Sequence, residues 1–485
     1  MDRPPSPPMN RRQFIAAGAA ATTTTCARRD RRPNVVVILT DDQRWDSMGC
    51  AGHPFLKTPH MDRIAAEGVR FANAFVTTSL CSPSRASLLS GLYAHTHGVT
   101  NNFTEYPGGF ESYPQILQAA GYQTAYFGKW HMGENNDAPR PGFHHWTSHR
   151  GQGTYNDTEF NINGRRETVP GYYTHVVTDM ATAWLAKQKA PFCMILGHKA
   201  PHSANIPEPK YERLFDNVDI KPPATVDDTG AGKGDWVRQR LATWHGVNGP
   251  LYGNRDYGKF VRSYLATIPS VDDSVGRVYD TLRRTGELDN TLLLFLADNG
   301  CLLGEHGAVD KRVMWEESIR VPLLVRHPER IKQPAVKREM VLNIDFAPTI
   351  LDICGAPPLS RVHGKSWRPL AEAQATEWRK SWYYEYNFEY EFPYTPNVRG
   401  VRTDEWKYIH YPNGEGVPDT QKAELYNLKD DPAETHNLID APERKEKAAE
   451  LRTELARLIR DSGAEPDRMP PSPVIRAEMP ADKIR

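Results

Sequence analysis

Cys81 begins the segment of this chain whose residue types point most directly to chemistry. It opens the run Cys81-Ser82-Pro83-Ser84-Arg85, which continues through Ser87 to Gly91. A cysteine is a potential nucleophile, but a lone cysteine is more often a small buried apolar residue. A Pro-Ser-Arg run is also common where a helix begins. The run therefore indicates catalysis only if other segments supply groups that act with it.

Two acidic and amide pairs are the next candidates. Each pair follows an apolar, strand-like run, and the pairs are Asp41-Asp42 and Asp298-Asn299. A single pair of this kind usually does no more than cap a loop. A hard divalent cation such as Ca²⁺ takes roughly six to eight oxygen ligands from rigid elements. Because both pairs come at the ends of buried strands, they could together supply oxygen ligands of this kind.

Lysine and histidine residues recur in three further segments. Residues 121–131 end in Lys129-Trp130-His131, residues 198–202 end in His202, and Lys311 follows the second acidic pair. A lone Lys-x-His pattern is usually part of the solvated surface. Here all eleven residues of segment 121–131 fit, in order, a signature of the family named below.

Taken together, these segments resemble the type I, formylglycine-dependent sulfatases from about residue 33 to about residue 440. The resemblance implies that Cys81 is oxidised by a formylglycine-forming enzyme to an aldehyde whose hydrate is the nucleophile. It implies one Ca²⁺ per chain, held by Asp41, Asp42, Asp298, Asn299 and the modified residue 81. Metal charge would lower the cost of ionising the hydrate.

The resemblance also implies a role for each remaining candidate. Lys129 and Lys311 would bind the sulfate, and Arg85 would orient residue 81 and offset the sulfuryl charge. His202 would protonate the departing oxygen as general acid, and His131 would take the proton from the second hydroxyl of the hydrate. His198 is expected to be structural. Weaker candidates for the site are His95, His97 and His306.

Within the family, the chain looks most similar to the N-acetylglucosamine-6-sulfatases, including the bacterial mucin-desulfating sulfatases. The segments that carry this likeness are residues 39–43, 81–87, 101–102, 200–203, 270–273, 285–291 and 343–353. The expected substrate is 6-O-sulfated N-acetylglucosamine or a related sulfated glycan. The animal pattern lacks a histidine where this chain has His131, so another sulfated glycan or an aryl sulfate also fits.

Three other functions are open at this stage. A phosphonate or phosphate ester hydrolase of the same superfamily would use the same aldehyde and metal, and relative turnover of the two ester classes separates it. A non-catalytic protein that binds sulfated glycans would result if Cys81 stayed a thiol. A transferase would pass the sulfate to another alcohol, which product analysis would reveal.

Composition excludes other classes. The 485 residues include 60 basic and 60 acidic ones, so no overall charge favours nucleic acid or an anionic membrane. The six cysteines lack a C-x-x-C spacing, and structural zinc is not expected. The sequence leaves open whether Cys50, Cys193, Cys301 and Cys354 pair.

The elements that must position these groups follow from apolar patterning. Residues 35–39, 192–196, 292–296 and 321–325 are continuous apolar runs typical of buried strands, and residues 257–282 have helical periodicity. Strands that alternate with helices predict an α/β fold with an open, mostly parallel sheet, whose ligands bind at the carboxyl ends of the strands. The resemblance implies an alkaline-phosphatase-like form of this fold.

The domains expected are a catalytic one at 31–370 and a smaller antiparallel α+β subdomain at 371–465, followed by a tail at 466–485. In the subdomain, strand-like segments precede an amphipathic helix whose apolar stripe runs from Ala448 to Ile459. Packing of that stripe against the strands is expected.

The first 30 residues resemble a twin-arginine export signal, with Arg11-Arg12 before a short apolar stretch. That stretch is too short for a stable membrane span. The protein is thus expected to be exported to the periplasm or outside the cell. Cys26 is a weak candidate for a lipid anchor.

Overall fold

The computed structural model describes residues 32–469, apart from residues 190, 250–255, 375 and 413–421. The predicted export signal with Cys26, and the part of the predicted tail beyond Met469, lie outside the described residues.

A ten-stranded sheet lies at the centre of the larger part of the fold, in the order β14-β2-β13-β9-β1-β8-β4-β5-β6-β7. The five adjacent strands from β9 to β5 run parallel. This mostly parallel sheet confirms the predicted fold class. The strands are β1 (Asn34–Asp41), β2 (Val69–Phe71), β4 (Gln123–Gly128), β5 (His145–Ser148), β6 (Asn156–Ile162), β7 (Arg165–Tyr172), β8 (Phe192–Pro201), β9 (Thr291–Ala297), β13 (Leu323–Arg326) and β14 (Ala335–Lys337).

The apolar run at residues 321–325 differs from the other three. It is divided between β12 (Arg320–Val321) and β13, and β13 pairs antiparallel with β9. Pro322 lies between the two strands and has no N–H to continue a ladder. β12 instead pairs with β3 (Ala74–Phe75), which also pairs with β15 (Val341–Leu342).

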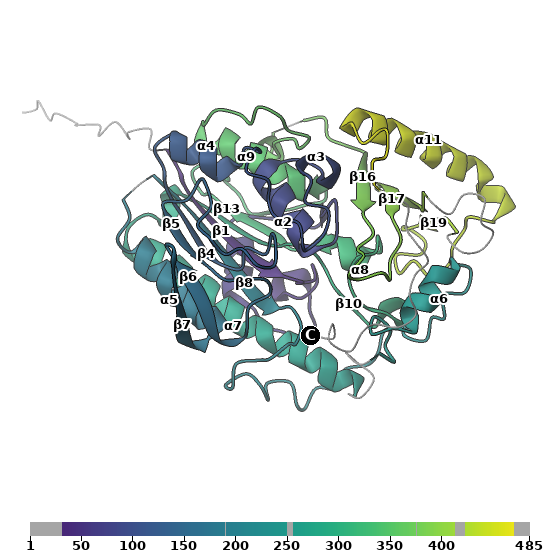
Figure 1. Ribbon diagram of the computed structural model, residues 1–485, viewed down its shortest axis with the longest axis horizontal. Helices are drawn as coiled ribbons and strands as arrows, with labels where there is room; N and C mark the ends of the chain where they lie inside the picture. The colour runs from purple at the N-terminus through teal and green to yellow at the C-terminus, as the bar shows by residue number, and fades with distance from the viewer. Residues whose placement is uncertain (1–31, 190, 250–255, 375, 413–421, 470–485) are drawn as a thin grey trace, which may run out of the picture. The chain divides into compact units, whose positions relative to one another are not determined.

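Helices cover both faces of the sheet (Figure 1). Alternate residues of β1 enter opposite apolar clusters: Val36 packs with α1, α5 and α7, whereas Val37 packs with α2, α4 and α9. The predicted helix at 257–282 is α7, and Gly286 follows its end with a φ of +75°. The helices are α1 (Pro59–Ala66), α2 (Cys81–Ser90), α4 (Tyr113–Ala119), α5 (Tyr173–Leu185), α7 (Tyr257–Arg284) and α9 (Phe346–Cys354).

A four-stranded antiparallel sheet and one long helix form the carboxyl-terminal part, as predicted. The elements are β16 (Ser381–Tyr386), β17 (Val398–Thr403), β18 (Trp406–His410), β19 (Glu424–Asn427) and α11 (Lys445–Ser462). Ala448, Leu451 and Leu455 of α11 are buried in one apolar cluster with this sheet. The cluster includes Leu80, so the small sheet supports the start of α2.

The remaining α-helices and strands are short: α3 (Ala94–His97), α6 (Asp235–Leu241), α8 (Glu316–Ile319), α10 (Arg368–Ala371), β10 (Leu302–Leu303) and β11 (Val309–Asp310). No helix among the described residues is long and apolar enough to cross a membrane. Nothing in these elements tests the predicted domain boundary at residue 370, which stays a prediction.

Candidate active site

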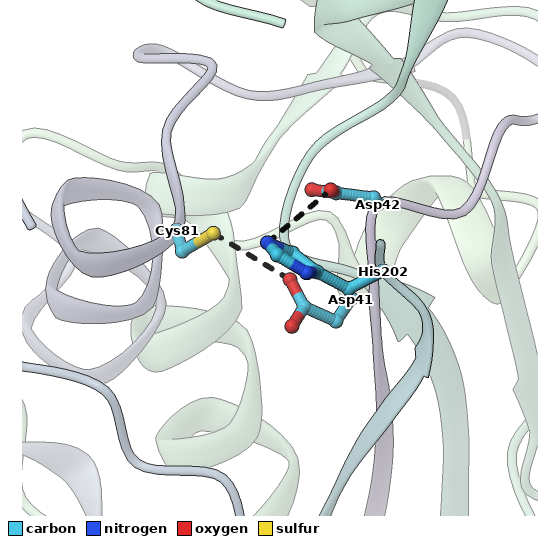
Figure 2. A group of neighbouring side chains, drawn as sticks. All are labelled: Asp41, Asp42, Cys81 and His202. Atoms are coloured by element: carbon cyan, nitrogen blue, oxygen red, sulfur yellow. Dashed lines mark hydrogen bonds and ion pairs between the residues drawn. The ribbon is translucent and has the colours of Figure 1, made fainter. Parts of the chain in front are cut away.

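Cys81 is the first residue of α2 and is fully buried. Its Sγ lies 3.5 Å from Asp41 Oδ1 and 3.9 Å from Lys129 Nζ. Figure 2 shows the sulfur pointing from the start of the helix toward the Asp41 carboxylate. Burial raises the pKa of the Cys81 thiol well above its usual range, although Lys129 opposes this effect. At neutral pH residue 81 is therefore a protonated thiol unless it is chemically changed.

The two acidic pairs meet because their strands are neighbours. Asp41 ends β1, Asp298 and Asn299 follow β9, and β1 and β9 pair in register. The backbone N–H of Asp42 donates to Asp298 Oδ1 at 3.1 Å, and Asn299 Nδ2 donates to Asp42 Oδ1 at 2.6 Å. All four side chains are buried. The structure thus brings the predicted oxygen donors to one edge of the sheet.

Three buried cations compensate the three carboxylates. Lys129 pairs with Asp41, Lys311 with Asp42, and Arg85 Nε lies 2.8 Å from Asp298 Oδ2. Burial alone would raise the pKa of Asp41, but Lys129, His202 and Arg85 hold it well below the usual range. Burial raises the pKa of Asp42 to about 7 despite Lys311, because Asp41 and Asp298 lie nearby.

The donor set fits a hard divalent cation. Three carboxylates and one amide converge, and Asn299 Oδ1 is a buried acceptor with no hydrogen-bond donor among the described residues. Such an orphaned oxygen is costly unless a ligand satisfies it. Ligand atoms of Asp41, Asp42, Cys81 and His202 also lie within 4.8 Å of one another. This set is rich in oxygen, the ligand type that Ca²⁺ prefers.

Two histidines border the cluster. His202 Nε2 lies 3.7 Å from Asp42 Oδ2 (Figure 2), while its Nδ1 donates to the Ser203 carbonyl oxygen at 2.7 Å. His131 Nε2 lies 3.1 Å from Glu134 Oε1, and its Nδ1 is buried without a partner among the described residues. Burial, reinforced by nearby lysines, lowers the pKa of both imidazoles well below the usual range.

Comparison with known proteins assigns the chain to a family. A family model described as Sulfatase matches residues 33–356, well over half of the chain. A second model, N-sulphoglucosamine sulphohydrolase, C-terminal, matches residues 304–461. The chain belongs to the sulfatase family. It is a sulfuric ester hydrolase, as its motifs predicted.

Relatives of this sulfatase come from bacteria and animals. An N-acetylglucosamine-6-O-sulfatase of Bacteroides thetaiotaomicron is 35% identical over 480 residues, which cover 85% of this chain and 84% of the relative. An extracellular sulfatase of Drosophila melanogaster is 32% identical over 65% of this chain, a match that spans only 29% of that longer protein.

A solved structure is similar over nearly the whole chain. It is a protein in complex with its substrate, D-glucosamine-2-N,6-O-disulfate, at 32% sequence identity and a TM-score of 0.83. The match covers 90% of this chain and 99% of that one. The alkaline-phosphatase-like architecture predicted for this sulfatase is thereby confirmed.

The weaker histidine candidates lie outside the cluster. His306 packs against Trp315 at 4.3 Å between ring centroids, with its Nε2 3.9 Å from Glu317 Oε2, in a separate buried group. His95 Nδ1 lies 3.0 Å from Glu385 Oε1, and His97 Nε2 lies 3.1 Å from Ser87 Oγ. His198 Nε2 lies 3.1 Å from Ser274 Oγ on α7, a contact consistent with the expected structural role.

A pocket of about 530 Å³ opens beside His202, and sequence reasoning missed two of its polar residues. Gln152 Oε1 accepts a hydrogen bond from Lys129 Nζ, and Lys199 lies three residues before His202 on β8. One signal was available for Lys199: strand alternation places it on the opposite face from the structural His198. Nothing in the sequence links Gln152 to Lys129.

The five described cysteines, Cys50, Cys81, Cys193, Cys301 and Cys354, are all unpaired.

Proposed function

We propose that this sulfatase hydrolyses the 6-sulfate of N-acetylglucosamine, or of a related sulfated glycan, through a formylglycine derived from Cys81 and one bound Ca²⁺. The observation that carries the proposal is the position of Cys81, whose Sγ lies 3.5 Å from Asp41 and 3.9 Å from Lys129 at the start of α2. The names of the Bacteroides relative and of the bound sugar in the solved structure support the substrate class.

The chemistry of residue 81 supports the modification. A buried thiol with a raised pKa is a poor nucleophile at neutral pH. After oxidation to formylglycine, the hydrate would supply a hydroxyl nucleophile and a second hydroxyl whose deprotonation expels the sulfate and restores the aldehyde. Arg85 is held by Asp298 and by the Lys129 carbonyl, and it would keep residue 81 in line with the ester.

The metal would be held by Asp41, Asp42, Asp298, Asn299 and residue 81. When bound, Ca²⁺ would supply positive charge that stabilises the anionic sulfuryl group. Lys129 and Lys311 are buried at this point and would hold the sulfate oxygens from two sides. A side-chain carbon at Gly128 would lie 1.9 Å from the Gly197 carbonyl oxygen, so glycine allows β4 and β8 to approach there and place Lys129.

The two histidines divide the proton transfers. His202 borders the pocket, and its Nδ1 is occupied by the Ser203 carbonyl, so Nε2 would protonate the departing sugar oxygen. A bound anionic sulfate would favour the charged imidazolium and offset the pKa-lowering effect of burial. His131 is buried with a lowered pKa, which suits the neutral base that accepts the hydrate proton.

Export of the protein is also proposed. Its support is the twin-arginine-like pattern at Arg11-Arg12 and the extracellular name of the Drosophila relative. The twin-arginine route carries folded chains, so it would accommodate a residue already modified inside the cell.

Peptide mass spectrometry across Cys81, paired with turnover assays, tests the proposal. Protein from a strain that co-expresses a formylglycine-forming enzyme should show a loss of about 18 Da at Cys81, and Cys81→Ala should abolish turnover. N-Acetylglucosamine 6-sulfate should be hydrolysed in preference to phosphate or phosphonate esters. An intact thiol in active protein, or faster phosphate ester hydrolysis, would overturn the proposal.

A further inference from the structure

Lys199 is a buried cation on the wall of the pocket beside His202. Lys199 is only 5% exposed, and its Nζ donates to the Gln152 carbonyl oxygen at 3.1 Å. The ammonium lies 5.3 Å from the centre of the Tyr155 ring. The ion pairs of the described residues include none at Lys199, whereas Lys129 and Lys311 both have carboxylate partners. A buried ammonium without a counter-charge is unfavourable unless a ligand supplies one.

The loop of Gly151, Gln152 and Gly153 holds Lys199 in place beside Lys129. Gln152 joins the two lysines, since its side-chain oxygen accepts from Lys129 and its carbonyl accepts from Lys199. Gly151 and Gly153 on either side have φ values of +47° and +64°. A side-chain carbon at Gly153 would lie 2.5 Å from the His149 ring, so the loop conformation requires glycine.

A second cation lies at the rim of the same pocket. Arg150 lines the pocket, its side chain is 50% exposed, and its Nε is 4.0 Å from Asp137 Oδ2. The carboxylate on the pocket wall, Glu134, faces His131 Nε2 at 3.1 Å.

Lys199 is largely protonated at neutral pH. Burial and the nearby Lys129 lower its pKa to about 8, a value at which most of the population is still charged at pH 7.

We infer that Lys199, assisted by Arg150, forms a specificity subsite for a second anionic group on the substrate, beside the sulfate that is hydrolysed. This rests on the proposed function and deepens it, because it selects among sulfated sugars. In the proposed function Lys129, Lys311 and Arg85 serve the scissile sulfate. The ammonium of Lys199, which lines the pocket beside His202, is therefore available for a further sulfate or carboxylate. That group is an N-sulfate on the same sugar or the carboxylate of an adjoining uronic acid.

Steady-state kinetics of Lys199→Met on three sugars test the inference. The sugars are N-acetylglucosamine 6-sulfate, which has one anion, glucosamine N,6-disulfate, and a disaccharide that joins a uronic acid to N-acetylglucosamine 6-sulfate. Loss of a charged hydrogen bond should lower kcat/KM about ten- to a hundredfold on the sugar that carries the recognised anion, mainly through KM. The change on the singly charged sugar should stay within about threefold.

Three variants accompany Lys199→Met. Lys199→Arg should restore most of the preference, because it retains the charge. Arg150→Gln changes a half-exposed side chain, so it tests the same discrimination if Lys199→Met fails to fold. Lys221→Met removes a lysine whose side chain is 79% exposed and should alter none of the ratios.

Binding to a Cys81→Ala protein separates this inference from the proposed function. Calorimetry should show that glucosamine N,6-disulfate or the disaccharide binds more tightly than the singly charged sugar, and that Lys199→Met removes the difference. If the unmutated protein turns over no sulfate ester but this preference remains, the proposed function fails and the subsite stands. Equal losses on all three sugars, or no loss on any, would overturn the subsite.

Discussion

At the scale of single residues, the site is a balanced set of buried charges. Asp41, Asp42 and Asp298 face Lys129, Lys311 and Arg85, and none of the six is more than 4% exposed. Buried ion pairs contribute little net stability, whereas removing one partner typically costs about 3–5 kcal/mol. We therefore interpret this arrangement as preparation for an anionic substrate and a cation, both of which would exchange with the existing pairs.

The role proposed for His202 as general acid predicts that the effect of its loss depends on the leaving group. His202→Gln should lower kcat on a sugar 6-sulfate by about 10²- to 10⁴-fold, because a sugar alkoxide needs protonation as it leaves. On 4-nitrophenyl sulfate the loss should be less than about tenfold, since nitrophenolate leaves without a proton. Rates on the two substrates measured side by side check this.

His198→Gln is the matched control for that comparison. His198 lies on the same strand but contacts Ser274 of α7, so its loss should affect stability and leave the ratio of the two rates unchanged. Equal rate losses on both substrates in His202→Gln would mean that His202 is not the general acid.

At the scale of elements, α3 connects the catalytic part to the carboxyl-terminal part. Both ring nitrogens of His95 face acceptors: Nδ1 lies 3.0 Å from Glu385 of β16, and Nε2 lies 3.0 Å from the Ser462 carbonyl oxygen at the end of α11. Two acceptors favour the imidazolium, so the pKa of His95 is raised even though burial alone would lower it. Arg399 lies nearby and adds unfavourable positive charge. The His363 ring, 5.8 Å from the His95 ring between centroids, stays neutral because burial and His95 lower its pKa to about 4.

This pair predicts a pH window for stability. Burial would raise the pKa of Glu385, but His95, helped by Arg399, lowers it from 4.5 to about 2. That net shift corresponds to about 3 kcal/mol when Glu385 is ionised. That contribution is present above pH 4.5 and is lost as pH falls toward 2. The His95 contribution is present below pH 6.5 and is lost as pH rises through its raised pKa.

Urea unfolding of the unmutated protein and Glu385→Gln across this range measures the effect. The difference in unfolding free energy should be largest near pH 5–6 and should shrink on both sides, because acid titration elsewhere cancels between the two proteins. A difference that stays constant from pH 3 to pH 9 would show that the pair is not ionised in the folded state.

At the scale of the whole molecule, residues far apart in sequence meet because of strand order. Asp41 and Asp298 are neighbours since β1 and β9 pair, and the apolar runs and the polar residues that follow them were enough to predict this. The placement of Cys81 at a helix start was also accessible from its motif. The antiparallel β13 and the strands β5 to β7 could not be predicted from the sequence. Their pairing depends on tertiary contacts that short, irregular runs do not encode.

The ion pairs inside the site could be seen only in the structure. The family resemblance implied that Lys129 and Lys311 bind the sulfate, but it did not indicate that they lie opposite Asp41 and Asp42. The pocket residues Gln152 and Lys199 come from a loop and a strand end. Strand alternation separates Lys199 from His198, but no local pattern links either pocket residue to Lys129. Motif-based prediction thus identifies residues that the structure brings together around Cys81, and it does not reach the pocket residues beside them.

Because the proposed Ca²⁺ ligands come from the ends of two central strands, metal binding should stabilise the whole fold. A ligand at one hundred times its dissociation constant adds about 2.7 kcal/mol to the unfolding free energy. Chelator-treated protein should therefore unfold at lower urea concentration and lose activity, and added Ca²⁺ should restore both.

Asn299→Ala removes the orphaned oxygen donor and should weaken the Ca²⁺-dependent shift. Asp137→Asn breaks the ion pair between the buried Asp137 and the partly exposed Arg166, away from the proposed metal ligands, so it should lower the baseline stability yet retain the full shift. A shift of equal size in Asn299→Ala would place the metal elsewhere, and no shift in the unmutated protein at any Ca²⁺ concentration would mean that this donor set does not hold Ca²⁺.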